Sequence, residues 1–283
     1  MQKFIAPKAQ TLKDFTDETY AQGSFAFSRL LREKDVRING QRTGKNVMLA
    51  AGDEVVYYTT PREEAKPFYD TVYEDEHILV ADKYDGVSSE ALFAALSREK
   101  GARFIHRLDR NTRGIVCFAL DAAAEEELLA AFRERRAEKL YEAVCFHPFI
   151  KESARLEAYL WKDERASRVR VFAKPQKGAE KIVTEYSLRQ NFAEYALVDI
   201  RLHSGKTHQI RAHMAFIGHP VAGDDKYGDE ALNKKYGVHR QLLVAKSLRL
   251  QCGGGLAYLN EKKFTSRFSP RLEGADGPKQ IGE

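Results

Sequence analysis

Short strand-like segments recur along most of this chain without the regular strand–helix alternation that a parallel sheet requires. After a strand–turn–strand pattern at 72–83, β-branched and aromatic residues concentrate at 103–105, 114–120, 139–146, 155–160, 168–173, 182–190, 195–202 and 248–250. Helical patterns are fewer, and the clearest spans 122–136 after a suitable N-cap at Asp121. The pattern predicts the α+β class, with a mixed, largely antiparallel sheet and flanking helices.

A polar stretch with two prolines at 61–69 is typical of a linker, because the residues before proline avoid helix and few side chains here can be buried. The sequence therefore predicts a small domain at 1–60 and a larger domain at 70–264. Residues 265–283 lose periodicity, and we expect a loose C-terminal tail.

Composition excludes several classes of protein. The 283 residues are 43% hydrophobic and 31% charged, which allows a real core under a solvated surface. No stretch approaches the about 18 uncharged apolar residues of a membrane span, and the N-terminus has no apolar signal region. Cys117, Cys145 and Cys252 are far apart and odd in number, which argues against a disulfide framework or a zinc knuckle. We expect a cytoplasmic, monomeric protein.

Positive charge is concentrated in two places although the formal net charge is only +5. Residues 29–45 hold six cations against two acids, and 162–181 hold a second basic run. Clustered cations suit the phosphates of a nucleic acid, which dominate such binding through counterion release. A solvated charged face is the alternative for either cluster.

The first basic cluster belongs to a pattern of small elements. A helix starting near a Ser24 cap is followed by a strand at 36–40 that ends in an Asn–Gly turn, and by short strands at 46–49 and 54–59. This order resembles the S4 RNA-binding module. The resemblance implies that basic residues of this unit contact folded RNA, and the candidates are Arg29, Arg32 and Arg37. A purely structural cap is the alternative.

The segment His106-Arg107-Leu108-Asp109-Arg110-Asn111-Thr112-Arg113-Gly114 is the first that carries chemistry. It places Asp109 on a loop between two predicted strands, where reactive groups are often held. Asp109 can also cap the turn by accepting backbone N–H groups. The neighbouring Arg107 and Arg110 favour a reactive role, because opposite charge keeps a carboxylate ionised, as a nucleophile must be.

A second segment, residues 202–214, leads from a strand into a helix that we expect to be capped by Thr207. His208 and Arg211 are three residues apart and share a helix face that can meet an anion. A metal site on His203, His208 and His213 is the alternative. Five helical residues rotate by about 140°, so the last two rings diverge, and no carboxylate completes the set. We therefore expect no metal and no cofactor.

Tyr141 starts a predicted strand directly after the charged helix. A buried aromatic of the core is its commoner role. A tyrosine beside a reactive carboxylate can instead stack on an unstacked RNA base. The local sequence does not decide between these two roles.

Taken together, His106–Gly114, Lys139–Ala143, Gly205–Gly228 and Arg240–Leu250 stand in an order that resembles the RluA-type RNA pseudouridine synthases, over about residues 70 to 260. The resemblance implies isomerisation of uridine to pseudouridine in ribosomal or transfer RNA, without metal or organic cofactor. It implies that Asp109 is the catalytic aspartate, Tyr141 the base-stacking residue and Arg211 the partner of the aspartate. Further candidate RNA contacts are His106, Arg107, Arg110, Lys206 and His208. His106 and Arg107 can instead fix the loop, and the sequence does not decide between the two roles.

Three positions depart from the pattern of that family. Arg113 stands where serine is usual, Tyr84 where proline is usual and Val244 where histidine is usual. Arg113 raises the alternative of a non-catalytic RNA-binding or ribosome-assembly factor with the same fold. A metal-dependent hydrolase built on the histidines is a more remote alternative. The sequence does not choose whether an aspartate would attack C1′ or C6 or remove the C2′ proton.

Overall fold

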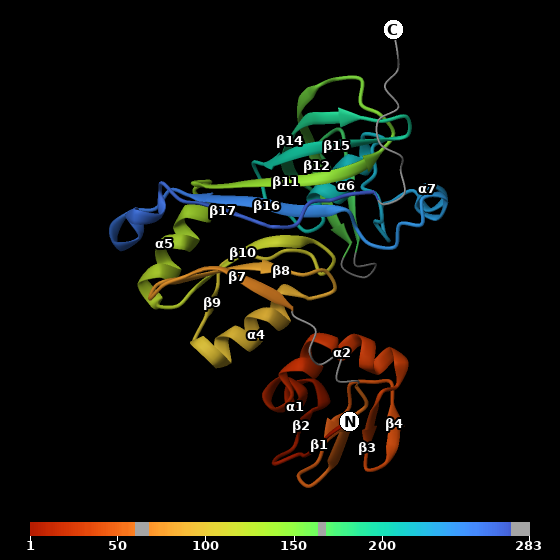
Figure 1. Ribbon diagram of the computed structural model, residues 1–283, viewed down its shortest axis with the longest axis vertical. Coiled ribbons are helices and arrows are strands. Elements are labelled where there is room, and N and C mark those ends of the chain that lie inside the picture. Colours follow the sequence, from red (N-terminus) through yellow and green to blue (C-terminus); the bar gives the residue numbers. More distant parts are fainter. Residues whose placement is uncertain (60–67, 164–167, 273–283) are drawn as a thin grey trace.

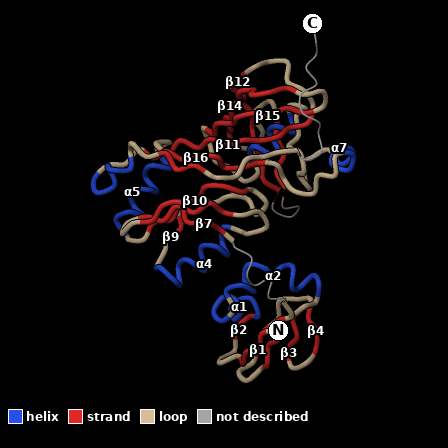
Figure 2. Tube along the Cα trace, viewed as in Figure 1, coloured by secondary structure: helices blue, strands red, loops and turns tan. Residues whose placement is uncertain are grey.

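A computed structural model describes residues 1–59, 68–163 and 168–272 of the chain. In Figure 1 a small N-terminal unit, coloured red and orange, lies below a larger body built on one extended sheet. Figure 2 shows that strands dominate the larger body, with helices at its margins. The stretch 61–67, which makes up most of the predicted linker, lies outside the described residues.

The N-terminal unit packs two helices against a four-stranded sheet of order β1-β6-β3-β4. Its elements are β1 (Gln2–Ile5), β2 (Gln10–Thr11), α1 (Leu12–Thr19), α2 (Ala21–Glu33), β3 (Val36–Ile38), β4 (Gln41–Thr43), β5 (Met48–Leu49) and β6 (Glu54–Tyr57). Strands β2 and β5 form a separate pair. Phe15, Leu30 and Tyr57 are fully buried between helices and sheet, which gives this unit a core of its own.

The predicted start of the N-terminal helix is wrong. The helix begins at Ala21 rather than after Ser24, because α2 follows α1 through a sharp turn at Tyr20. The ring of Tyr20 lies against those of Phe4 and Tyr57. Packing of this aromatic cluster thus fixes the start of α2, where no side chain forms a capping hydrogen bond.

The larger body contains a sheet whose main path runs β13-β12-β14-β15-β11-β16-β10-β8-β7. Its strands are β7 (Tyr69–Glu74), β8 (Ile78–Lys83), β9 (Arg103–Phe104), β10 (Arg113–Ala119), β11 (Ala137–Phe146), β12 (Ser153–Asp163), β13 (Arg168–Phe172), β14 (Glu180–Asn191), β15 (Tyr195–Leu202), β16 (Leu243–Leu250) and β17 (Lys263–Thr265). Among the described residues, only β10 and β16 pair parallel in this sheet. The predicted α+β class and the largely antiparallel sheet are confirmed.

Helices cover the sheet on both faces. They are α4 (Ser89–Lys100), α5 (Ala122–Arg133), α6 (Gln209–Phe216) and α7 (Glu230–Lys235), with a 3₁₀ turn at Gly254–Leu259. The predicted Asp121 cap is confirmed, since its side chain accepts the Ala124 N–H. Strand β10 is buried on both faces, with Val116 and Phe118 in one core and Cys117 in the other. None of the described helices is long and apolar enough to cross a bilayer.

The predicted loose tail is wrong for its first residues. Thr265 ends β17, which pairs with β16. Ser266 is buried, and its hydroxyl donates to the carboxylate of Asp82 on β8. Burying a carboxylate without hydrogen-bond donors is costly, so the hydrogen bond from Ser266 to Asp82 stabilises the chain in its place against the sheet. Residues 273–283 of the predicted tail lie outside the described residues.

One row of residues across the sheet places the Asp109 loop. Gly114 on β10 is opposite Ala245 on β16, and Ala245 is opposite Tyr141 on β11. Gly114 has φ +114°, and a Cβ added there would be 2.2 Å from the carbonyl oxygen of Ala245. Glycine is therefore required for β10 to approach β16 closely where the loop ends.

We expect Gly114→Ala to lower the free energy of unfolding by more than about 3 kcal/mol, because the new Cβ overlaps backbone and the φ is strained. Gly86→Ala is the matched control, since Gly86 also has positive φ (+79°) but an added Cβ meets nothing within 4 Å. The control should lose about 1 kcal/mol. Urea unfolding of both variants measures the difference, and equal losses would contradict the close-approach argument.

Candidate active site

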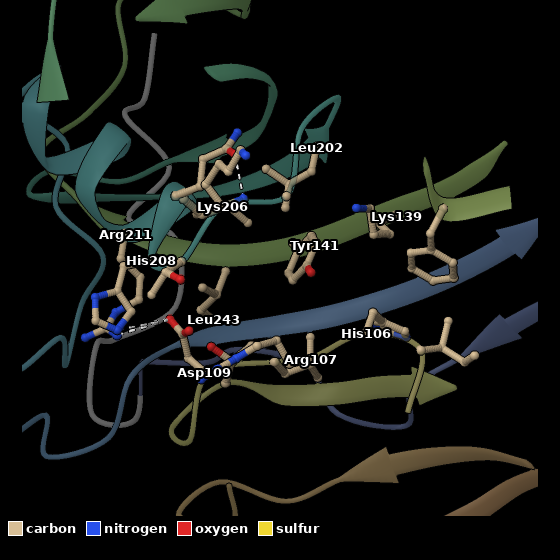
Figure 3. A pocket seen from close by; sticks show the side chains of 18 of the residues that line it. His106, Arg107, Asp109, Lys139, Tyr141, Leu202, Lys206, His208, Arg211 and Leu243 are labelled. Carbon is tan, nitrogen blue, oxygen red and sulfur yellow. Dashed lines mark hydrogen bonds and ion pairs between the residues drawn. The ribbon is translucent and has the colours of Figure 1, made fainter. Parts of the chain in front are cut away.

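A pocket of about 520 Å³ opens where the loops before β10 and after β15 meet the middle of the sheet. Its wall comes from 104–109, from Lys139 and Tyr141 on β11, from 202 and 205–211, and from Leu243 on β16. Figure 3 shows Asp109 and Arg211 at one end of this pocket, Tyr141 in the middle, and Lys139 with His106 at the other end. The fold thus gathers residues about 100 positions apart in sequence.

Asp109 and Arg211 are in direct contact at one end of the pocket. Arg211 Nη1 donates to Asp109 Oδ2 at 3.1 Å. Arg211 is itself held by Asp224, which accepts from Nε at 2.6 Å and from Nη2 at 2.9 Å. Asp225 accepts from Nη2 at 3.0 Å. A buried guanidinium with fixed acceptors on one side presents its remaining donors in one direction, toward Asp109.

Burial and charge act against each other in this cluster. Burial would lower the pKa of Arg211, but the hydrogen bonds and charges of Asp224 and Asp109 outweigh it and raise the pKa above its usual value. Burial would raise the pKa of Asp224, but its bonds to Arg211 and to backbone N–H groups keep it low. Arg211 therefore stays charged beside Asp109 at any physiological pH.

His208 faces the same carboxylate from the start of α6. Its Nε2 is 4.0 Å from Asp109 Oδ2, and its Nδ1 is 3.0 Å from the hydroxyl of Tyr227. The expected Thr207 cap is wrong, because His208 occupies the N-cap position in a left-handed conformation with φ 54°. Burial lowers the pKa of His208, which keeps its ring largely neutral. The strained residue sits at the site itself, where such backbone strain is commonly found.

Four hydrogen bonds hold the backbone of the Asp109 loop. The hydroxyl of buried Ser89 donates to the Leu108 carbonyl and accepts its N–H, both at 2.9 Å. The ammonium of Lys83, which has no exposed surface, donates to the Arg110 carbonyl at 3.1 Å. The Thr112 N–H donates to the carbonyl of Asp109. The Asp109 carboxylate is thus presented by a rigid backbone, as a reacting group requires.

Tyr141 is both a residue of the core and a residue of the pocket wall, and its stacking on a base stays a prediction. Its ring is buried in the main core, yet it also lines the pocket. Burial, followed by the charge of Asp109, raises the pKa of its phenol, so the hydroxyl stays protonated. A flat, uncharged ring beside a carboxylate is suited to stack on a base.

Of the other predicted contacts on the loops, Arg107 and Lys206 line the pocket and Arg110 does not. Arg107 pairs with Glu90 at 2.8 Å, and both side chains are exposed. Lys206 pairs with Glu180. Arg110 donates to the Ser28 hydroxyl on α2 at 3.2 Å, so the N-terminal unit touches the Asp109 loop.

His106 differs from these cations. Its Nε2 accepts the Cys117 N–H at 3.0 Å, and its ring stacks on Phe132. Burial, with a smaller contribution from Lys139, lowers the pKa of His106 to about 3. The neutral ring of His106 is thus fixed against Cys117 and Phe132 and helps to hold the loop, and its contact with phosphate stays a prediction.

The three arginines predicted for the N-terminal unit lie outside the pocket. Arg29 and Arg32 both pair with Glu33 at the end of α2. The guanidinium of Arg37 lies over the ring of Tyr58, 5.0 Å from its centroid. Their contact with RNA stays a prediction.

The three histidines weighed as metal ligands face different partners. His203 Nε2 is 2.7 Å from Glu185, and His213 Nδ1 is 2.9 Å from the Thr184 hydroxyl, whereas His208 faces Asp109. The described residues contain no group of three or more His, Cys, Asp or Glu arranged to hold a metal. The predicted divergence of His208 and His213 is confirmed.

The three departures from the family pattern lie close together, and none of them lines the pocket. Arg113 donates to Asp85 at 2.6 Å and lies over the ring of Phe268. Val244 is its partner in the β10–β16 pairing. The ring of Tyr84 also packs on Phe268. Arg113 does not line the pocket, so its presence gives no reason to expect an inactive site.

Comparisons with known proteins agree with this geometry. The family model described as RNA pseudouridylate synthase matches residues 77–216. The ribosomal large subunit pseudouridine synthase C of Vibrio cholerae is 32% identical over 78% of each chain. The protein of the same name from Escherichia coli K12 is 31% identical over 78% of each chain.

Solved structures show the same relationship. Human RNA pseudouridylate synthase domain containing 1 is 27% identical, with a TM-score of 0.58, and the match covers 65% of this chain and 81% of the human one. Human RNA pseudouridylate synthase domain containing 4, at 22% identity and a TM-score of 0.57, shows the same fold. The chain therefore belongs to the family of RNA pseudouridylate synthases, which isomerise uridine in RNA.

Proposed function

We propose that this enzyme converts uridine to pseudouridine in large-subunit ribosomal RNA, with Asp109 as the nucleophile, Arg211 as the group that orients it, and Tyr141 as the platform for the base. The observation that carries the proposal is the 3.1 Å contact between Arg211 and Asp109 at the end of an open pocket. The ribosomal target is inferred from the names of the relatives, which are 31–32% identical. Transfer RNA is the alternative substrate, and mapping of pseudouridine in cellular RNA would distinguish the two.

The reaction exchanges one bond to the ribose for another and needs no oxidant or reductant. The C1′–N1 bond breaks, the uracil turns, a C1′–C5 bond forms, and the hydrogen on C5 leaves as a proton while N1 gains one. A carboxylate can promote the first step by attacking C1′ or C6 or by taking the C2′ proton. Arg211 favours the charged form of Asp109, which any of these routes requires.

The uridine must leave its stack to reach Asp109, which costs a few kcal/mol. Contacts with the extruded nucleotide and the flanking backbone offset this cost. We propose that residues 1–60 form a separate RNA-binding module that adds such contacts through Arg29, Arg32 and Arg37. The bond from Arg110 to Ser28 supports this proposal, because it places α2 beside the Asp109 loop.

Replacing Tyr141 separates its ring from its hydroxyl. We expect Tyr141→Leu to raise the KM for RNA about tenfold or more, because stacking on an aromatic contributes about 1–3 kcal/mol per base. Tyr141→Phe keeps the ring and should leave KM within about threefold of wild type. Steady-state kinetics with a substrate RNA measures both variants. A KM for Tyr141→Leu that equals that of Tyr141→Phe would remove stacking from the account.

The target is tested by mapping pseudouridine in total RNA from cells with and without this gene. We expect a modified uridine in large-subunit ribosomal RNA that disappears when the gene is deleted and returns when wild-type protein is supplied. Loss of a site in transfer RNA alone would contradict the ribosomal target. Identical maps would contradict the proposed function as a whole.

A further inference from the structure

The cations that line the pocket are not equally neutralised. Besides Arg211, they are Arg107, Arg133, Lys139 and Lys206, and Asp109 is the one carboxylate among the lining residues. Arg107 pairs with Glu90, Lys206 with Glu180, and Arg133 more distantly with Glu134. Arg211 has three carboxylate partners. Lys139 differs from all of them.

The Lys139 side chain is half-buried, and its ammonium has neither a hydrogen bond nor an ion pair to any residue that the structure describes. Its ammonium lies 5.7 Å from the centroid of the Phe132 ring. Burial lowers its pKa. A half-buried charge without an anion is costly, and an anionic ligand would remove that cost.

Lys139 and Tyr141 face the same pocket. The two residues are separated by one position on β11, so their side chains point to the same side of the sheet, about 7 Å apart along the strand. Residue 205 opposite is glycine, and a Cβ added there would be 3.2 Å from Lys139 Nζ. The absence of a side chain at Gly205 leaves the ammonium open to the pocket.

His106 adds a second donor at this end of the pocket. Its Nε2 accepts the Cys117 N–H, and its ring is neutral, so its proton is on Nδ1. This Nδ1–H has no acceptor within the described part of the chain. A fixed, neutral N–H beside an unpaired ammonium is a suitable arrangement for a phosphate oxygen. Figure 3 shows the two side chains at the same end, with Tyr141 between them and Asp109.

We propose that Lys139 and His106 form a phosphate subsite, which holds a phosphodiester of the RNA strand next to the uridine stacked on Tyr141. The subsite rests on the proposed function, since it takes the nucleotide that Asp109 attacks. The pocket then has a reactive end at Asp109 and a phosphate-binding end at Lys139. The uridine is positioned both by stacking on Tyr141 and by its bound phosphodiester.

The test compares uridine with uridine 3′,5′-bisphosphate, with binding followed by calorimetry or NMR titration. Wild type should bind the bisphosphate at least about tenfold more tightly than uridine. Lys139→Met keeps the aliphatic stem and removes the charge. Its affinity for the bisphosphate should fall about tenfold, and its affinity for uridine should not change. Lys235→Met is the matched control, because it removes a lysine that pairs with Glu194 on the surface and does not line the pocket.

A second arm uses the RNA in which mapping finds the wild-type product, made with a neutral methylphosphonate at one linkage beside the target uridine. If Lys139 binds that linkage, Lys139→Met should weaken binding of the unmodified RNA about tenfold, and the methylphosphonate should weaken binding to wild type by the same factor. The variant tested with the modified RNA should bind no more weakly than with either change alone. Unchanged preference for the bisphosphate in Lys139→Met, or additive losses at both flanking linkages, would overturn the subsite. A wild type that modifies no RNA would instead contradict the proposed function, and the nucleotide test would still decide the subsite.

Discussion

Asp109→Asn is expected to abolish pseudouridine formation, with a fall in kcat of at least about 10³-fold, while RNA binding stays close to that of wild type. The amide has nearly the same size and can still accept a hydrogen bond from Arg211 Nη1. It lacks the negative charge that a nucleophile or base needs. Chemical mapping of the substrate RNA measures the product, and a filter-binding assay measures the affinity.

Arg110→Gln is a useful control for this variant. Arg110 adjoins Asp109, but its guanidinium contacts Ser28 on the N-terminal unit rather than the carboxylate. We expect this control to weaken RNA binding at most and to leave kcat largely unchanged. Normal product from Asp109→Asn would remove Asp109 from the mechanism, and loss of RNA binding with it would make its role structural.

Asp224→Asn is expected to lower the free energy of unfolding by about 3 kcal/mol and kcat by about 100-fold. Asp224 is fully buried and accepts two hydrogen bonds from Arg211, so its loss leaves a buried guanidinium short of its counter-charge. The amide NH₂ of the new asparagine is itself a donor, so it could not accept a hydrogen bond from the Arg211 guanidinium as the replaced oxygen does. Arg211 would then no longer be fixed against Asp109, and a small displacement is costly in catalysis.

Asp225→Asn provides the matched control. Asp225 also accepts from Arg211 Nη2, at 3.0 Å, but its side chain is 63% exposed whereas that of Asp224 is 0% exposed. We expect a change in unfolding free energy within about 0.5 kcal/mol and a near-normal kcat. Urea unfolding and steady-state kinetics on both variants provide the comparison. Equal effects of the two substitutions would contradict the view that burial makes Asp224 the anchor of Arg211.

Local patterns predicted most strands of the larger body because alternation and turn residues are properties of short segments. They predicted β7, β8, β10 and β11 and the helix capped by Asp121. They missed α1 (Leu12–Thr19), and they placed the start of α2 too late, because the turn at Tyr20 depends on a ring contact with the distant Tyr57. Tertiary packing overrode the local capping preference there.

The site was predicted unevenly for the same reason. The resemblance identified Asp109, Tyr141 and Arg211, which the sheet brings to one pocket. The residues that hold them were missed, because Asp224, Ser89 and Lys83 act only through contacts that the fold creates. A signal for Asp224 was present in the paired acids of Gly-Asp-Asp-Lys-Tyr-Gly, since two adjacent carboxylates near an arginine-bearing helix suggest a partner for that arginine.

Release of tritium from RNA labelled at C5 of uridine tests the central claim most directly, because formation of the C1′–C5 bond expels the hydrogen on C5. The account predicts tritium release by the wild type in step with pseudouridine formation, and release at least about 10³-fold slower by Asp109→Asn under the same conditions. Release by Asp109→Asn at the wild-type rate, or no release by a wild type that binds the RNA, would contradict it.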